Sequence, residues 1–334
     1  MKKKFKVTYS HVLIAICVLM FLVFGMVNAN FFTFSYVMDM LTLNAEICIM
    51  ALPLTLLIIM GCIDFSMCAV LSLSAAVGGI VHTFAGPLVG ALVTLLIGVA
   101  CGAFNGFMVS KLKLPPLITT LATMYLYKGI AKGATLASGW GTNVSATPVA
   151  TFLGNTEFLY IPTQLWLIAI LAVALHLVLS KTVYGRTLYA IGLNENAARF
   201  AGIEVVRIKF LTYVLAGALF AVAGLVLMGR FSTIQYDSAD SFQMQVIIVC
   251  VLGGANMDGG RGTIGGTLLG TLVLSVLKGG MNAVALPQTQ QKIILGIVLL
   301  VSLISFQLLA EHELKVKGRA RMKAAAEALS ASQK

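Results

Sequence analysis

Long apolar runs separated by short polar segments dominate this chain. Ten of them predict helices that cross a membrane: 11–27, 45–60, 66–84, 88–109, 116–136, 163–180, 210–229, 242–254, 263–283 and 292–310. A helix rises 1.5 Å per residue, so the shorter runs barely match a hydrocarbon core of about 30 Å. Pro53 in the second run and Gly253-Gly254 at the end of the eighth indicate short or broken spans. The pattern predicts an all-α polytopic membrane protein with about ten transmembrane helices.

Composition supports this prediction. Of the 334 residues 59% are hydrophobic and only 10% charged, with a mean hydropathy of +0.97. A soluble domain carries about 25% charged residues, so an ordinary soluble enzyme is excluded. The alternating segments of about 10 residues that are typical of a membrane β-barrel are not visible. We expect a transmembrane domain over 1–310 and a basic cytoplasmic tail over 311–334, which either lies on anionic lipid or is solvated.

The positions of the basic residues predict the orientation. The net charge of +11 would suggest nucleic acid as the partner of a soluble protein, but most Lys and Arg lie between or beyond the apolar runs. The loops 28–44 and 139–162 contain neither and are expected outside. With an even number of spans, both termini are cytoplasmic. The basic N-terminus and first run also resemble a signal peptide, but they open a chain full of such runs, which favours an uncleaved first span.

Few residues in the chain point to catalysis. It contains no G-x-x-x-x-G-K-[ST] and no G-x-S-x-G, and its four histidines lack metal-ligand spacing. The six cysteines form no C-x-x-C pair and are interpreted as small buried hydrophobes. Acidic residues deep in the runs are nearly absent, with Glu46 and Asp64 at the ends of the second, so a proton relay has little to be built from. We therefore expect no catalytic residues, no metal and no cofactor in this chain, and an energy source in another subunit.

The cytoplasmic loop 181–209 contains a short predicted helix. Asn194 is a good N-cap, Glu195 complements the positive helix end, and Gly202 suits the position that ends the helix. A helix of about two turns is too short to be stable alone, so it implies a surface against which it docks. The residues expected to couple the chain to a motor subunit are Gly192, Asn194, Glu195, Ala197, Ala198, Arg199 and Gly202.

Small residues recur at helical spacing in two runs. Gly98, Gly102 and Gly106 form a doubled G-x-x-x-G, and Gly266 and Gly270 repeat the pattern. Such residues let another helix approach closely, so we interpret both sets as packing sites.

Several stretches together resemble the permease subunits of bacterial monosaccharide ABC importers, the ribose, xylose, rhamnose and autoinducer-2 group within the branched-chain-amino-acid-type permease superfamily. The resemblance covers about residues 10–310. Besides the loop 181–209, it is carried by 51–55 with Gly61-Cys62-Ile63-Asp64-Phe65-Ser66, by Asn105-Gly106 with 114–121 and 127–129, and by 252–270. The chain departs from the family pattern at Cys62, at Met67-Cys68 and at Lys128, which makes transfer of a substrate from any one relative unsafe.

The resemblance implies a permease in the bacterial inner membrane that works without covalent chemistry of its own. Its partners would be an ABC ATPase that binds ATP and Mg, a second permease, identical or related, and a periplasmic sugar-binding protein. Residues expected at the translocation pathway or gate are Asp64, Ser66, Asn105, Asn256 and Gly260, with a structural cap or packing as the alternative role. A monosaccharide or polyol is the expected substrate. Autoinducer-2, a branched-chain amino acid, and a secondary transporter or channel remain as alternatives.

Overall fold

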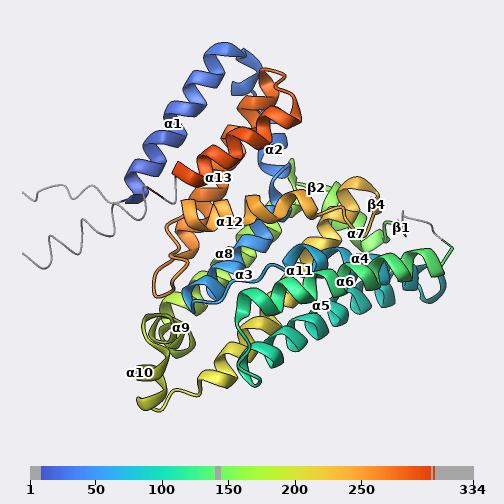
Figure 1. Cartoon of the computed structure of the whole chain (residues 1–334). Coiled ribbons are helices and arrows are strands. Elements are labelled where there is room, and N and C mark those ends of the chain that lie inside the picture. The colour runs from blue at the N-terminus through green and yellow to red at the C-terminus, as the bar shows by residue number, and fades with distance from the viewer. Residues whose placement is uncertain (1–8, 140–143, 302–303, 305–334) are drawn as a thin grey trace, which may run out of the picture. The chain divides into compact units, whose positions relative to one another are not determined.

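The fold of residues 9–139, 144–301 and 304 is described by a computed structural model (Figure 1). The chain divides into two compact units, Met1–Pro287 and Gln288–Lys334. The second unit contains the described helix Gln288–Val301; the predicted tail 311–334 lies outside the described residues. The helices of the first unit are α1 Tyr9–Val27, α2 Phe34–Thr42, α3 Ala45–Ile59, α4 Met67–Ala85, α5 Pro87–Ser110, α6 Pro116–Ala137, α7 Pro148–Asn155, α8 Thr163–Lys181, α9 Val183–Leu193, α10 Glu195–Phe200, α11 Val205–Phe231, α12 Gln243–Leu252 and α13 Ile264–Ala283.

Strands are minor elements. Val144–Ser145 (β1) pairs antiparallel with Thr233–Ile234 (β4), and Glu157–Phe158 (β2) pairs with Ile161–Pro162 (β3). Short 3-10 turns, Ala29–Phe32 and Asp240–Phe242, precede α2 and α12. The fold is therefore helical, as the apolar pattern predicts.

Each of the ten predicted runs contains a helix in its described part, although residues 302–303 and 305–310 of the tenth run lie outside the described residues. Not every run is long and apolar enough to cross a membrane. Helices α4, α5, α8, α11 and α13 are long and apolar enough to cross, and the bent pair formed by α2 and α3 is a sixth if counted as one span. The apolar segments Leu13–Val27, Asp240–Leu252 and Gln288–Val301 are shorter. Helix α6 has 22 residues but carries Lys128 and Lys132 and is not among the candidates.

Pro53 predicted a break within the second span, but the structure places the break before that span. Pro53 stays inside a continuous α3, whereas the chain bends by 49° between α2 and α3. Every residue of α3 is buried, and the helix packs against α8, α11, α12 and α13 (Figure 1). Because apolar neighbours surround α3, its side chains define the core of the first unit.

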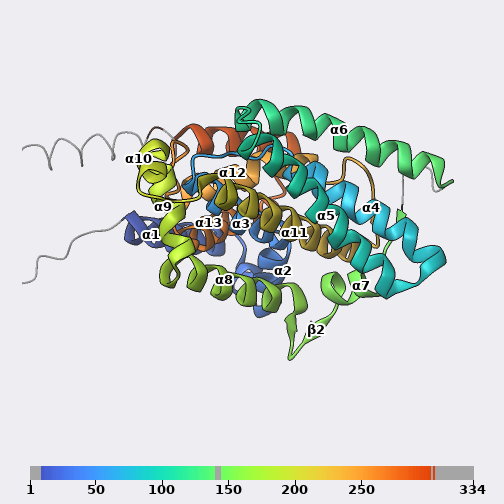
Figure 2. The same ribbon diagram turned by 90° about the horizontal axis from the view of Figure 1, so that it is seen from below.

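The segment 181–209, predicted as a loop around one short helix, contains more helix than expected. The Thr182 side chain accepts a hydrogen bond from the Gly185 N–H and caps α9. Helix α9 then buries Gly185, Leu188 and Ile191, a spacing of three that favours one helical face. Helix α11 begins at Val205, five residues before the predicted start. Helices α9 and α10 lie together at one end of the unit, and β1, β4 and α7 lie at the other (Figure 1 and Figure 2).

Helices α5 and α11 approach backbone to backbone along much of their length (Figure 2). A Cβ on Gly102 would overlap the Tyr213 carbonyl oxygen, and one on Gly98 would lie 2.5 Å from the Gly217 carbonyl oxygen. Gly266 and Gly270 likewise face the backbone at Gly253 and Val249. Both predicted sets of glycines therefore serve close packing.

Replacing Gly102 by Ala should destabilise the protein by about 1–3 kcal/mol, because the added methyl group meets fixed backbone of α11. The matched control is Gly133→Ala on α6, where a Cβ meets open space and stability should hold or rise slightly. Thermal unfolding in detergent measures both variants. Equal melting temperatures for the two would contradict the close α5–α11 contact.

Candidate translocation pathway and coupling segment

Four buried polar side chains form a hydrogen-bonded chain between the α3–α4 connection, α5 and α6. The Asp64 Oδ1 atom accepts bonds from the Ser66 N–H (2.7 Å) and the Ser66 hydroxyl (2.6 Å). The Asn105 amide donates to the Ser66 hydroxyl oxygen (2.7 Å), and the Tyr127 hydroxyl donates to Asn105 Oδ1 (3.0 Å). None of the four residues is more than 4% exposed. Three of the five predicted pathway residues therefore meet in one network.

This network holds the start of α4 in place. Asp64 and Ser66 directly precede Met67, where α4 begins, so the carboxylate lies at the positive end of the helix. Thr120 of α6 accepts a bond from the Phe65 N–H (3.1 Å) and joins the same region to α6. Tyr127 was not among the predicted site residues, although its Tyr127-Lys128-Gly129 motif was noted. Its spacing from Asn105 carries no signal that the two side chains meet.

The other two predicted pathway residues lie apart, in the loop 253–263 between α12 and α13. The Asn256 Oδ1 atom accepts a bond from the Asp258 N–H (3.2 Å) and shapes the turn. The Gly260 N–H donates to the Ile59 carbonyl (2.8 Å), one of the terminal carbonyls that α3 leaves free. Gly260 has a φ of +72°, a conformation that favours glycine. This loop therefore closes the end of α3.

The short predicted helix of the coupling segment is confirmed as α10. The Asn194 side chain accepts a bond from the Ala197 N–H (2.9 Å), as expected of an N-cap. Gly202 follows the helix with a φ of +84°, the left-handed conformation expected at its end. Ala198 is buried and Ala197 exposed. Gly192 belongs to α9 instead, where a Cβ would overlap the Ile59 carbonyl oxygen.

Two large apolar side chains flank α10 on its exposed side. Leu193 is 73% exposed and Phe200 is 93% exposed. Exposed apolar side chains of this size at both ends of a short helix are candidates for an interaction surface. The sequence analysis did not include Leu193 or Phe200 among the expected coupling residues. An apolar residue beside a short helix is equally typical of a side chain that is buried against the rest of the protein.

Glu195 ties α10 to α11. Its carboxylate contacts the Lys209 ammonium (2.6 Å) and the Arg199 guanidinium (2.9 Å). Partial burial acts to raise the pKa of Glu195, but the Lys209 hydrogen bond and the two positive charges outweigh it and hold the pKa below its usual value. Because the pKa is lowered on folding, the pair's contribution to stability is present at neutral pH and is lost as the pH falls through the pKa of the folded protein.

Helix α9 connects α10 to the core. The Tyr189 hydroxyl donates to the Gly262 carbonyl (2.7 Å), and Gly192 packs against the end of α3. One short helix therefore contacts both the loop 253–263 and α3.

A buried ionic cluster at the opposite end was not anticipated. The Arg230 guanidinium donates to Glu46 Oε1 (2.7 Å), and Glu46 is fully buried while the Arg230 side chain is 14% exposed. The second carboxylate oxygen has no hydrogen-bond partner within the described part of the chain. Nearby, Lys278 donates to Gln245 (3.0 Å). The sequence placed Glu46 at a helix end, but a partner 184 residues away leaves no local signal.

These features define a protein of long apolar helices with buried polar networks and a short capped helix, α10, at one end. The family model described as "Branched-chain amino acid transport system / permease component" matches residues 36–303, and the chain belongs to this family of multi-pass inner-membrane permeases.

Curated relatives agree over most of the chain. The ribose import permease protein of Bacillus subtilis is 34% identical over 85% of this chain and 88% of its own. Its counterpart in Escherichia coli K12 is 33% identical over 87% of this chain and 91% of its own. The autoinducer 2 import system permease protein LsrD of Enterobacter sp. is 33% identical, covering 89% and 92%. No solved structure matches the chain significantly.

Replacing Glu46 by Gln should destabilise the protein by about 3–5 kcal/mol, because it leaves the largely buried Arg230 guanidinium without its counter-charge. Glu204→Gln is the matched control, since the Glu204–Arg207 pair is about 70% exposed and such pairs contribute little. Thermal unfolding provides the readout. A Glu46→Gln variant as stable as the control would show that the buried pair does not hold α3 to α11.

Proposed function

We propose that this chain is the permease subunit of an ATP-binding-cassette importer that translocates a monosaccharide across the inner membrane. It would alternate access, powered by ATP and Mg bound to a separate ATPase, and receive its substrate from a periplasmic binding protein. The observation that carries the proposal is α10: a capped short helix, flanked by exposed Leu193 and Phe200, whose contacts lead into the core. Membership in the permease family supports it.

The proposed coupling route starts where the ATPase binds α10. Movement of α10 passes through the Glu195–Lys209 pair to the start of α11 and through α9 to Ile59 and Gly262. These positions lie at the cytoplasmic end of the elements that surround α3. Shifting them relative to the Asp64 network opens or closes the pathway. We assign Asp64, Ser66 and Asn105 to this gate, and Asn256 and Gly260 to the loop that moves with α3.

We also propose that the protein has about ten spans with both termini in the cytoplasm. The segment 144–162, which contains no Lys or Arg, lies at the end opposite α9 and α10 (Figure 1), as the positive-inside rule requires. Of the shorter helices, α12 would be a span that other helices cover, because its residues from Val246 to Val251 are buried, and this lowers its need for full length and hydropathy. A second permease, identical or related, would complete the pathway.

The relatives favour a sugar as the substrate. Two are named as ribose import permeases and one as an autoinducer 2 import permease, at nearly equal identity. We therefore propose a pentose, hexose or polyol, with autoinducer-2 as the second candidate. Radiolabelled ribose uptake with and without unlabelled autoinducer-2 as a competitor separates the two.

Gly202→Val should reduce ATPase co-purification and ATP-driven uptake, because a β-branched residue at a φ of +84° is strained by about 1–3 kcal/mol and misplaces the end of α10. A Cβ there meets no neighbour, so the core should stay intact. Gly265→Val is the control, at another open position without that backbone conformation. Retained ATPase binding by Gly202→Val would contradict the role of α10.

Asp64→Asn tests the gate. Asparagine keeps the oxygen that accepts both Ser66 hydrogen bonds, so the protein should assemble, while loss of the charge should lower ATP-driven uptake in proteoliposomes. Asp39→Asn on the exposed face of α2 is the matched control. If uptake by Asp64→Asn equals that of the control, Asp64 serves only to cap α4.

A further inference from the structure

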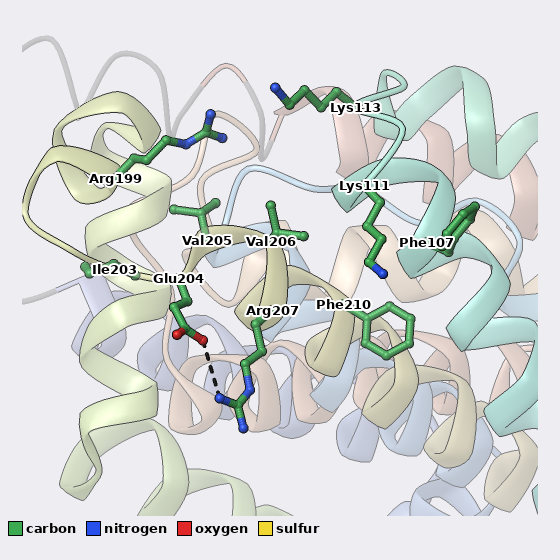
Figure 3. Close-up of a pocket in the computed structure, with 10 residues that line it drawn as sticks. All are labelled: Phe107, Lys111, Lys113, Arg199, Ile203, Glu204, Val205, Val206, Arg207 and Phe210. Atoms are coloured by element: carbon green, nitrogen blue, oxygen red, sulfur yellow. Dashed lines mark hydrogen bonds and ion pairs between the residues drawn. The ribbon is translucent and has the colours of Figure 1, made fainter.

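A cavity of about 710 Å³ lies beside α10, between the end of α5 and the start of α11 (Figure 3). Its lining combines two kinds of side chain. Phe107, Val206 and Phe210 supply apolar surface, and Lys111, Lys113, Arg199 and Arg207 supply positive charge. The cavity is separate from the Asp64 network, and it shares Arg199 and the start of α11 with the proposed coupling route.

The charge in this cavity is unbalanced. Arg199 pairs with Glu195, and Arg207 pairs with the one acidic lining residue, Glu204. Among the residues that the structure describes, neither Lys111 nor Lys113 forms an ion pair with a carboxylate. Figure 3 shows the Lys111 side chain directed toward Phe210, and its ammonium lies 5.8 Å from the Phe107 ring centroid. Two lysines therefore offer positive charge to an anion next to an apolar surface.

An exposed apolar stripe on α5 leads into the cavity. The stripe consists of four residues that are each at least 41% exposed: Leu92, Leu96, Phe104 and Phe107. Their spacings of four, eight and three residues place them on one face of the helix. Because α5 is a candidate membrane span, this face lies in the hydrocarbon region. Phe107 belongs both to the stripe and to the cavity lining. The cavity is thus continuous with a surface suited to an acyl chain.

From this juxtaposition we propose that the cavity binds an anionic phospholipid of the inner leaflet. The lipid phosphate contacts Lys111, and Lys113, whose side chain Figure 3 shows directed away from Phe210, adds positive charge to the same lining. An acyl chain runs along Phe107 and up the stripe on α5. Basic pockets at the cytoplasmic ends of membrane helices bind anionic head groups in this way. The assignment to the inner leaflet rests on the proposed orientation. The bound lipid bridges α5 and α11 beside α10 and so stabilises the position of the coupling helix.

An acidic segment of the partner ATPase is the competing occupant. A soluble segment would meet the lysines, but it would have no reason to extend along the lipid-facing stripe of α5. The continuity of cavity and stripe therefore favours the lipid.

The test is native mass spectrometry of the purified full chain, titrated with phosphatidylglycerol and, separately, with phosphatidylcholine. The double variant Lys111→Gln/Lys113→Gln should bind phosphatidylglycerol at least about tenfold more weakly, because each basic residue near an anionic lipid contributes about 1 kcal/mol. Lys181→Gln, an exposed basic residue at the end of α8 and outside the cavity, is the control and should bind like the unaltered chain. Val206→Trp should also weaken binding, since it fills the cavity without changing charge.

Three results would overturn the proposal: equal affinity for both lipids, equal loss in the Lys181→Gln control, or equally tight binding of free glycerol 3-phosphate. Lysine variants that keep phosphatidylglycerol in this assay but lose the ATPase in a separate co-purification would assign the cavity to the ATPase instead. Lipid binding is measured on the permease alone, so the result does not depend on whether uptake needs ATP. If the chain binds no lipid, the ATP-driven uptake assay still tests the proposed function separately.

Discussion

The close approach of α5 and α11 is the contact on which the other features depend. In hydrocarbon, apolar surface gains little by leaving lipid, so helices associate where their backbones come close enough for dense packing. Gly98 and Gly102 on α5 and Gly217 on α11 create that approach. Helix α5 carries Asn105 of the polar network. Helix α11 carries Lys209, which pairs with Glu195 of α10. The α5–α11 pair therefore joins the Asp64 network to the segment that contains α10.

Polar contacts inside the first unit fix the relative positions of elements that apolar packing alone would not specify. The Asp64 network joins the α3–α4 connection to α5 and α6, and the Glu46–Arg230 pair joins α3 to α11 at the other end. Each is buried, where an unpaired polar group costs far more than in water. Helix α3 is thus constrained at both ends, and α9, which contacts Ile59 and Gly262, connects α10 to one of these ends.

The apolar pattern predicted the helical class, the position of each long helix and the glycine contacts, because span length and small-residue spacing are local properties. Asn194 and Gly202 also predicted the limits of α10, since capping acts within a few residues. Helix α9 was missed because its sequence is short and contains two glycines, Gly185 and Gly192, which disfavour a helix unless tertiary packing of Leu188 and Ile191 stabilises it. Contacts between distant segments, such as Tyr127 with Asn105 and Glu46 with Arg230, depend on tertiary packing and have no local signature.

Gentle purification of this chain from its native membrane, with mass spectrometry of whatever accompanies it, tests the central claim most directly. The account predicts a P-loop ATPase in stable association, since Leu193 at the end of α9 and Phe200 at the end of α10 are exposed to such a partner. The same experiment shows whether the second permease is identical or related. A chain that purifies alone, and still moves substrate into vesicles without ATP, would contradict the account.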